Sequence, residues 1–202
     1  MAVEVILFDL GKVIIDFDGN EMVRQLSACC SKSVDEFERV LCDSKLAHRY
    51  ETGAITTEQF YHHLIEFGGL QMTMPAFLKA WSSVFKAELM ISEDLLKTLR
   101  RRYPLILVSN TNEAHVEFIA KNYPVFDYFE HKVFSFEVHV MKPDRGIYEC
   151  AIALSRTRPE ALFFVDDREE NVQGARELGI PAHQFKTEAG LIAALRDSGI
   201  DL

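Results

Sequence analysis

Residues 3–9, Val-Glu-Val-Ile-Leu-Phe-Asp, decide the fold that we expect for this chain of 202 residues. The run is apolar almost throughout and ends on an aspartate, which is typical of a strand buried on both faces of a parallel sheet. Comparable short runs, bounded by turn residues, recur at 105–109, 132–134, 161–165 and 182–185. The sequence therefore predicts an α/β protein with a parallel sheet.

The segments between and after the later runs carry apolar residues at helical spacing. They are residues 113–121, 144–154, 169–178 and 188–196. Gly179 follows the third segment, where a residue with positive φ commonly ends a helix. Strands that alternate with helices in this way indicate a doubly wound, Rossmann-like sheet with helices on both faces, so we expect three layers.

A long helical stretch interrupts this alternation after the first strand. Residues 20–99 read as consecutive amphipathic helices without a strand signal, and Thr56 with Gln59 forms the pattern of a capping box. A simple crossover between parallel strands does not need a connection of this length. We therefore assign residues 1–16 and 86–202 to an α/β core, and residues 17–85 to an all-helical cap inserted after strand one.

Composition excludes several classes of protein. Twenty-two Lys and Arg residues against 31 Asp and Glu residues give a net charge of −9, the wrong sign for a protein that grips nucleic acid. No apolar stretch approaches the ~20 residues of a membrane helix, and the first residues lack the basic region of a signal peptide. The four cysteines do not have the spacing of a zinc site. We expect a cytoplasmic protein without membrane or nucleic-acid partners, and no obligate protein partner is evident.

Polar residues stand where the predicted strands end, which is the edge at which open α/β sheets bind ligands. A group of carboxylates at this edge would repel one another unless a cation joined them, and Mg²⁺ prefers such oxygen ligands. A hydroxyl, an amide and an ammonium group from the same edge would complete a phosphate cradle. The residues concerned are Asp9, Ser109, Asn110, Lys142, Asp166 and Asp167.

The order of these residues along the chain resembles the four motifs of the haloacid dehalogenase-like hydrolases. The motifs read Phe-Asp-Leu-Gly-Lys-Val at 8–13, Val-Ser-Asn at 108–110, Met-Lys-Pro at 141–143 and Phe-Val-Asp-Asp at 164–167. The Asn-Val-Gln-Gly-Ala segment at 171–175 is similar to another stretch of that family. The resemblance covers the whole chain and implies a phosphatase that acts on a small phosphorylated metabolite.

The resemblance also implies a role for each motif residue. Asp9 would attack phosphorus and form an aspartyl-phosphate, and Lys142 would neutralise the charge of the nucleophile and the phosphate. The phosphate would further contact the backbone N–H of Leu10, together with Ser109 and Asn110. Mg²⁺ would be held by Asp9, by the backbone carbonyl of Gly11, and by Asp167 with help from Asp166. We favour Asp167 as the main ligand of the pair, because Asn171 follows it at the family's spacing.

Gly11 departs from the family pattern, in which a second aspartate at this position acts as general acid and base. Proton transfer of this kind contributes about 10²–10⁴-fold to a rate. Either another residue supplies the proton, or the leaving group departs without help, as the anomeric oxygen of a sugar phosphate can. The motif resembles an Asp-Leu-Gly branch of the family that includes bacterial phosphatases of sugar phosphates such as glucose 1-phosphate. The candidates for a replacement acid are Asp16, Asp18, His48 and Glu51.

Three other functions stay open at this point. A dehalogenase of the same fold also lacks the second aspartate and needs no metal, although the pair Asp166 and Asp167 would then have no purpose. A noncatalytic protein could retain the phosphate site after losing its acid. A phosphomutase usually relies on the second aspartate, so Gly11 argues against it.

Overall fold

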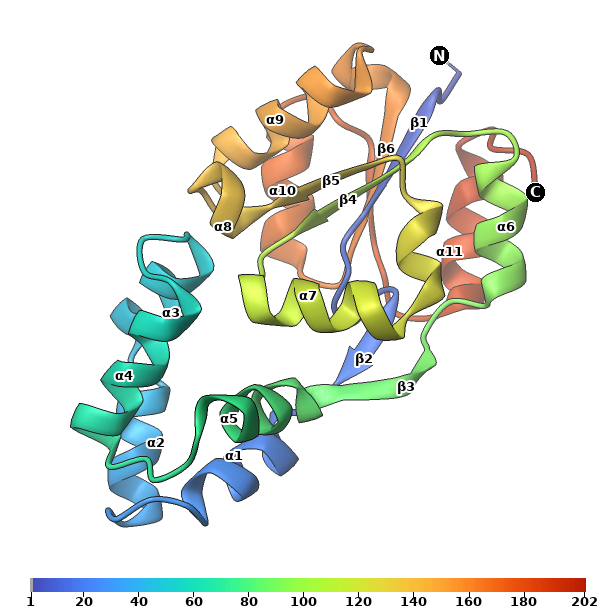
Figure 1. Ribbon diagram of the computed structural model, residues 1–202. Helices are drawn as coiled ribbons and strands as arrows, with labels where there is room; N and C mark the ends of the chain where they lie inside the picture. Colours follow the sequence, from blue (N-terminus) through green and yellow to red (C-terminus); the bar gives the residue numbers. More distant parts are fainter. Residues whose placement is uncertain (1) are drawn as a thin grey trace.

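The computed structural model describes residues 2–202 and contains a five-stranded parallel sheet (Figure 1). The strands lie in the order β5-β4-β1-β6-β7, and every pairing between neighbours is parallel. Their bounds are β1 Val5–Phe8, β4 Leu105–Ser109, β5 His131–Phe134, β6 Leu162–Asp166 and β7 Ala182–Gln184. The predicted α/β class is confirmed, and the opening apolar run forms the central strand.

Helices cover both faces of this sheet, as the alternation of side chains along a strand requires. Ile6 and Phe8 of β1 pack with α6, α7 and α11, whereas Val5 and Leu7 pack with α9 and α10. The helix bounds are α6 Glu93–Arg100, α7 Glu113–Asn122, α9 Arg145–Ser155, α10 Glu169–Glu177 and α11 Glu188–Asp197. All four β1 side chains are buried, and each contributes roughly 1.5–3 kcal/mol of hydrophobic stabilisation. The expected three layers are thus present.

The ends of the predicted core helices agree with the structure to within one residue. Gly179 follows α10 with a φ of 80°, a conformation that favours glycine. A short helix, α8 Ser135–Val138, follows β5 directly.

The inserted residues form five helices with a hydrophobic cluster of their own. The helices are α1 Gly19–Ser27, α2 Val34–Leu41, α3 Ser44–Glu51, α4 Thr57–Gly68 and α5 Met74–Trp81. Phe37, Phe60 and Phe77 are fully buried in this cluster. Thr56 caps α4 with the predicted capping box. Figure 1 shows these helices facing the edge of the sheet at which β1 and β4 end, with α3 nearest to α8.

Two strands were missed by the sequence analysis: one lies just before residue 20, and the other lies within residues 20–99, where no strand was expected. β2 Ile15–Phe17 and β3 Phe85–Leu89 pair in antiparallel fashion at the base of the inserted helices. Both are short, and β3 has only exposed or half-buried side chains, so neither carries the apolar pattern by which a strand is recognised. The boundaries expected at 16/17 and 85/86 therefore fall inside this strand pair. We keep residues 17–85 as the proposed cap, with β2 and β3 as its two connections to the core.

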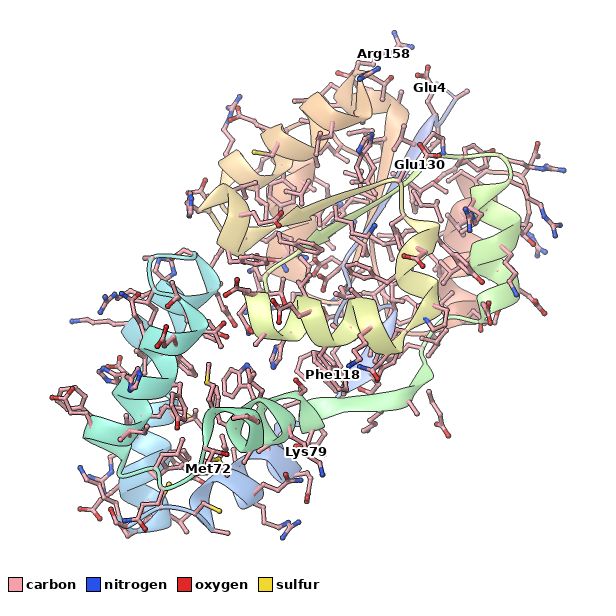
Figure 2. All side chains as sticks on the ribbon, in the orientation of Figure 1. Glu4, Met72, Lys79, Phe118, Glu130 and Arg158 are labelled. Atoms are coloured by element: carbon pink, nitrogen blue, oxygen red, sulfur yellow. The ribbon has the colours of Figure 1, made fainter. Side chains whose placement is uncertain are left out.

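The strand pair also contacts the core through aromatic side chains. Phe118 points from α7 toward β3 (Figure 2), where its ring stacks on Phe85 with 5.9 Å between the centroids. Glu4 and Arg158 lie at the opposite end of the sheet from the inserted helices (Figure 2). None of the helices within residues 2–202 has the length and apolar character needed to cross a membrane.

Candidate active site

A buried lysine joins two carboxylates where β1 and β6 end. The Nζ atom of Lys142 lies 2.7 Å from Oδ1 of Asp9 and 2.6 Å from Oδ2 of Asp166. The side chain of Lys142 is 1% exposed, so these charged hydrogen bonds are shielded from water. The backbone N–H of Asp9 donates to the carbonyl of Val165 on β6, which fixes the start of the loop after β1.

The electrostatics of this group favour an additional positive charge. Burial, together with the nearby carboxylate of Asp166, raises the pKa of Asp9 to about 6, although Lys142 opposes the shift. Burial disfavours the charged form of Lys142, but Asp9 and Asp166 outweigh this effect and raise its pKa. One lysine is thus balanced against more than one carboxylate in a site with little water.

Asp167 completes a set of three carboxylates suited to a metal ion. One oxygen each of Asp9, Asp166 and Asp167 can be chosen so that all three atoms lie within 4.8 Å of one another. Burial and the charge of Asp166 raise the pKa of Asp167. Hard oxygen ligands grouped in this way fit Mg²⁺.

The two neighbouring aspartates have different surroundings. Asp166 is fully buried, with one oxygen paired to Lys142 and the other accepting from the backbone N–H of Arg168 and from Nδ2 of Asn171, each at 2.9 Å. Asp167 is half-buried, and its carboxylate faces the hollow above Asp9. Both oxygens of Asp166 are therefore already bonded to protein groups, Lys142 among them. Asp167, which lines the hollow, is better placed to bind a cation.

Asn171 offers an independent indication that the site is built for a ligand. Its Oδ1 atom is buried and has no hydrogen-bond partner among residues 2–202. A buried oxygen without a partner is costly, so such an atom calls for a donor that the protein itself does not supply. Asn171 lines the hollow that contains Asp9 and Asp167, where a water bound to a cation would be such a donor.

Asn110, in the loop after β4, holds the backbone of Lys142 with its side chain. Nδ2 of Asn110 donates to the carbonyl of Lys142 at 2.9 Å, and Oδ1 of Asn110 accepts from the N–H of Lys142 at 2.7 Å. The side chain of Asn110, expected to contact phosphate, is thus occupied with holding Lys142. Ser109 is buried and lines the hollow above Asp9, as its expected contact with phosphate requires.

Ser135 is a supporting residue that the sequence analysis did not single out. Its hydroxyl accepts from the N–H of Thr111 at 2.9 Å and donates to the Thr111 carbonyl at 3.1 Å. This buried contact ties the loop after β4 to the start of α8. A lone serine after β5 gave no signal by which this role could be predicted.

Two adjoining hollows meet at this site. The polar hollow, of about 210 Å³, contains Asp9, Lys142 and Asp167. The second, of about 260 Å³, lies between the core and the inserted helices, and most of its wall is apolar. Its apolar side chains are Leu10, Phe17, Met22, Trp81, Val84, Phe85 and Ile119. The geometry thus offers a charged end for an anion and a mostly apolar end for the group attached to it.

Gly11 lies at the junction of the two hollows, beside the ring of Phe17. A Cβ atom at position 11 would lie 2.9 Å from Cε1 of Phe17, closer than carbon atoms normally approach. The place where the family pattern puts an acidic side chain is thus taken up by an aromatic ring. Lys12 follows with a φ of 58° and bonds to Asp16 at 2.6 Å.

Comparison with known proteins gives a consistent family. The model of the haloacid dehalogenase-like hydrolases matches residues 3–179. A D-ribitol-5-phosphate phosphatase of Bacteroides thetaiotaomicron is 27% identical over 185 residues, which are 89% of this chain and 90% of that protein.

Two solved structures are similar over nearly the whole chain. One is a haloacid dehalogenase-family enzyme of B. thetaiotaomicron in complex with magnesium and inorganic phosphate; its TM-score is 0.80 at 29% identity, and the match covers 92% of this chain and 96% of that one. The other is a hydrolase of Porphyromonas gingivalis described as haloacid dehalogenase-like, with a TM-score of 0.82, 26% identity and full coverage of both chains.

Proposed function

The chain belongs to the haloacid dehalogenase-like hydrolases, and we propose that it is a Mg²⁺-dependent phosphatase in which Asp9 forms an aspartyl-phosphate. The observation that carries this proposal is the buried pairing of Lys142 with Asp9 and Asp166, beside Asp167. An enzyme that transfers a phosphoryl group works mainly by positioning it and by stabilising its charge, and these residues supply both.

Asp9 is the proposed nucleophile because its carboxylate lies in the polar hollow and is held at a fixed position. The ion pair with Lys142 favours the charged form that attack requires, in opposition to the effect of burial. Lys142 also offsets the negative charge of an incoming phosphoryl group. Ser109 and the backbone N–H of Leu10 are proposed to hydrogen-bond the phosphoryl oxygens.

Asp9, Asp167 and the carbonyl of Gly11 are the proposed ligands of Mg²⁺, with Asp166 supporting them from behind. The cation supplies further charge neutralisation for the phosphoryl oxygens. The three clustered carboxylates and the unpartnered oxygen of Asn171 support this choice of cofactor, and so does the magnesium bound to the B. thetaiotaomicron enzyme.

The proposed substrate is the phosphate monoester of a small hydroxylated compound, a sugar or a sugar alcohol. The hollow next to the polar site has room for a group of this size. No lysine or arginine lines this hollow, so it offers no partner for a second phosphate. The relative named a D-ribitol-5-phosphate phosphatase supports the same class.

The proposal is tested by following phosphate release from para-nitrophenyl phosphate and from a panel of sugar and sugar-alcohol phosphates. We expect turnover that needs Mg²⁺, that stops with EDTA and returns when Mg²⁺ is restored, and that is lost in Asp9→Asn. Activity unaffected by EDTA, or retained in Asp9→Asn, would contradict the proposal.

The same preparation also tests two of the alternatives that the sequence leaves open, the dehalogenase and the noncatalytic protein. A metal-independent dehalogenase would release halide from a 2-haloacid in the presence of EDTA. A noncatalytic phosphate-binding protein would bind inorganic phosphate with Mg²⁺ but would turn over no ester.

A further inference from the structure

Position 11, where the family pattern places an acid to protonate the leaving group, holds a glycine, although most phosphate esters need such an acid. An alkoxide is a poor leaving group at neutral pH, and proton transfer in the transition state accelerates its departure. Gly11 stands where an acid would be expected, and the ring of Phe17 fills the adjacent space. A replacement acid has to reach the junction of the two hollows from another element.

The side chains of two of the four sequence candidates, Asp16 and Asp18, are engaged in contacts elsewhere. The hydrogen bonds of Asp16 to Lys12, at 2.6 Å, and to Lys86, at 2.7 Å, lower its pKa to about 2, so it holds no proton to donate. Asp18 caps α1 by accepting from the N–H of Asn20 at 2.9 Å. Neither Asp18 nor His48, the third candidate, lines the two hollows.

Glu51 occupies the required position. It is the last residue of α3, and it lines both the polar hollow with Asp9 and the mostly apolar hollow beside it. The residues common to the two hollows are Gly11, Phe17, Glu51, Ser109 and Asn110. Among these five, Glu51 alone has an ionisable side chain. When an ester is bound with its phosphate in the polar hollow and its alcohol group in the other, the oxygen that links the two lies at this junction.

The backbone next to Glu51 is fixed to the core on its C-terminal side. The carbonyl of Thr52 bonds to Nδ1 of His139 at 2.9 Å. Gly53 has a φ of 67° and packs so closely on the carbonyl of Phe136 that a Cβ atom would lie 2.1 Å from that oxygen. These contacts hold the end of α3 against the segment around α8, and Figure 1 shows the two helices close together.

The surroundings of Glu51 are consistent with a proton carrier. Burial raises the pKa of its carboxyl group, and this effect outweighs the opposing charges of His48 on α3 and Arg168 after β6. Glu51 shares the polar hollow with the ion pair of Asp9 and Lys142. Lys12 and Asp167 line the same hollow. A carboxyl group with a raised pKa is a better proton donor near neutral pH than one fully exposed to water.

We propose that Glu51, carried by the inserted helices, is the general acid and base of this phosphatase. The inference rests on the proposed function. In the first half-reaction, an oxygen of Asp9 bonds to phosphorus while the bond from phosphorus to the leaving oxygen breaks, and the proton of Glu51 moves to that oxygen to release an alcohol. In the second, Glu51 takes a proton from water as the water oxygen bonds to phosphorus, and the bond from Asp9 to phosphorus breaks to release inorganic phosphate.

This assignment separates the two explanations of Gly11 that the sequence leaves open. With Glu51 as the acid, esters of unactivated alcohols are substrates, and the enzyme does not depend on an anomeric leaving group. Proton transfer also becomes conditional on the docking of α3, because the donor belongs to the inserted helices and the nucleophile to the core.

The test compares the native protein with Glu51→Gln on Mg²⁺-loaded enzyme. The substrates are para-nitrophenyl phosphate, whose leaving group needs little protonation, and a sugar-alcohol phosphate, whose leaving group needs it. We expect kcat/KM for the alcohol ester to fall by about 10²-fold or more, and kcat/KM for the aryl ester to fall by less than about 10-fold. Glu58→Gln, an exposed glutamate on α4, is the matched control and should change neither value.

An equal loss on both esters, or no loss on either, would overturn the role of Glu51 while leaving the proposed phosphatase intact. Native enzyme that hydrolyses only anomeric phosphates would also overturn it, in favour of the leaving-group explanation. If the native enzyme hydrolyses no ester at all, the proposed function itself fails. Matching circular dichroism and melting temperatures establish that the variants are folded.

Discussion

The buried ammonium group of Lys142 lies 2.7 Å from the carboxylate of Asp9. A buried charge pair of this kind contributes little net stability, but removing one partner is costly because the other charge stays buried without compensation. In this site the remaining partners would be two carboxylates, since Asp166 shares the same lysine.

We therefore predict that Lys142→Met both inactivates and destabilises the protein. We expect the free energy of unfolding to fall by roughly 3–5 kcal/mol at pH 8 in EDTA. The loss should be smaller at pH 5, because Asp9, whose pKa is raised to about 6, can then take up a proton, which relieves the repulsion between the carboxylates. Denaturant unfolding at the two pH values measures the difference. Lys97→Met, which removes a lysine at the surface that is paired with Glu93 and 45% exposed, is the control and should cost at most about 1 kcal/mol.

Gly174 carries a second prediction, because it lets α10 approach the loop that holds Lys142. A Cβ atom at this position would lie 2.8 Å from the carbonyl oxygen of Pro143 and 3.2 Å from the ring of Tyr148. Backbone atoms cannot move aside as a flexible side chain can, so Gly174→Ala should displace the loop. We expect a loss of about 1–3 kcal/mol in unfolding free energy and a lowered kcat.

The matched control for this variant is Gly146→Ala on α9, where the added methyl group would make ordinary contacts at 3.4 Å or more. It should leave kcat unchanged and should preserve or slightly raise stability, since alanine favours helix. Equal effects of the two substitutions would show that the approach of α10 is not what positions Lys142.

The contact between Gly11 and Phe17 supports a third prediction. Gly11→Ala places a methyl group 2.9 Å from the Phe17 ring, so the ring must turn away from its preferred rotamer and the single variant should be destabilised by about 0.5–1.5 kcal/mol. Phe17 is 39% exposed, and Phe17→Ala should cost little by itself. In the double variant the methyl group finds room, so a double-mutant cycle of melting or denaturant curves should show a favourable coupling. Strict additivity of the two losses would argue against this contact.

These contacts also indicate which parts of the molecule could be predicted from the sequence. β1 and β4 were recognised because strands buried on both faces carry continuous apolar runs, and Asp9 and Ser109 stand directly at their ends. β3 was missed because its partner β2 lies far away in the sequence and because no side chain of β3 is fully buried. A strand of that kind is defined by its partner and carries little signal of its own.

The position of Glu51 illustrates the same limit at the site. Its helix could be expected from sequence, but its approach to Asp9 depends on contacts of Thr52 and Gly53 with residues far along the chain. Similarly, the motif at 108–110 identified Asn110 but gave no sign that its side chain bonds the backbone of Lys142. Motifs locate the residues that perform chemistry, whereas contacts between distant segments decide what each side chain is free to do.

The last prediction concerns acid sensitivity and rests on His115, a residue of α7 that packs on Trp81 of the inserted helices. Burial lowers its pKa to about 4, against an opposing hydrogen bond with the carbonyl of Trp81. Nδ1 of His115 lies 3.1 Å from Nδ2 of Asn112. Oδ1 of Asn112 accepts from the N–H of His115 and from Nε1 of Trp81, so the amide is oriented with its NH₂ group toward the ring. A neutral imidazole satisfies this arrangement, whereas a protonated one would set two donors against each other.

The unfolded chain takes up this proton near pH 6.5, but the folded protein does so only near pH 4. Folding stability is therefore lost as the pH falls from about 6.5 toward 4, by up to about 3 kcal/mol for this group. We expect His115→Gln to be less stable than the native protein at pH 7.5, because packing on Trp81 is lost, yet to lose less stability between pH 7 and pH 4.5. Denaturant midpoints measured across this range test the prediction. A variant as acid-sensitive as the native protein would show that the proton is taken up elsewhere, and His183→Gln, at the partly exposed histidine of β7, provides the comparison.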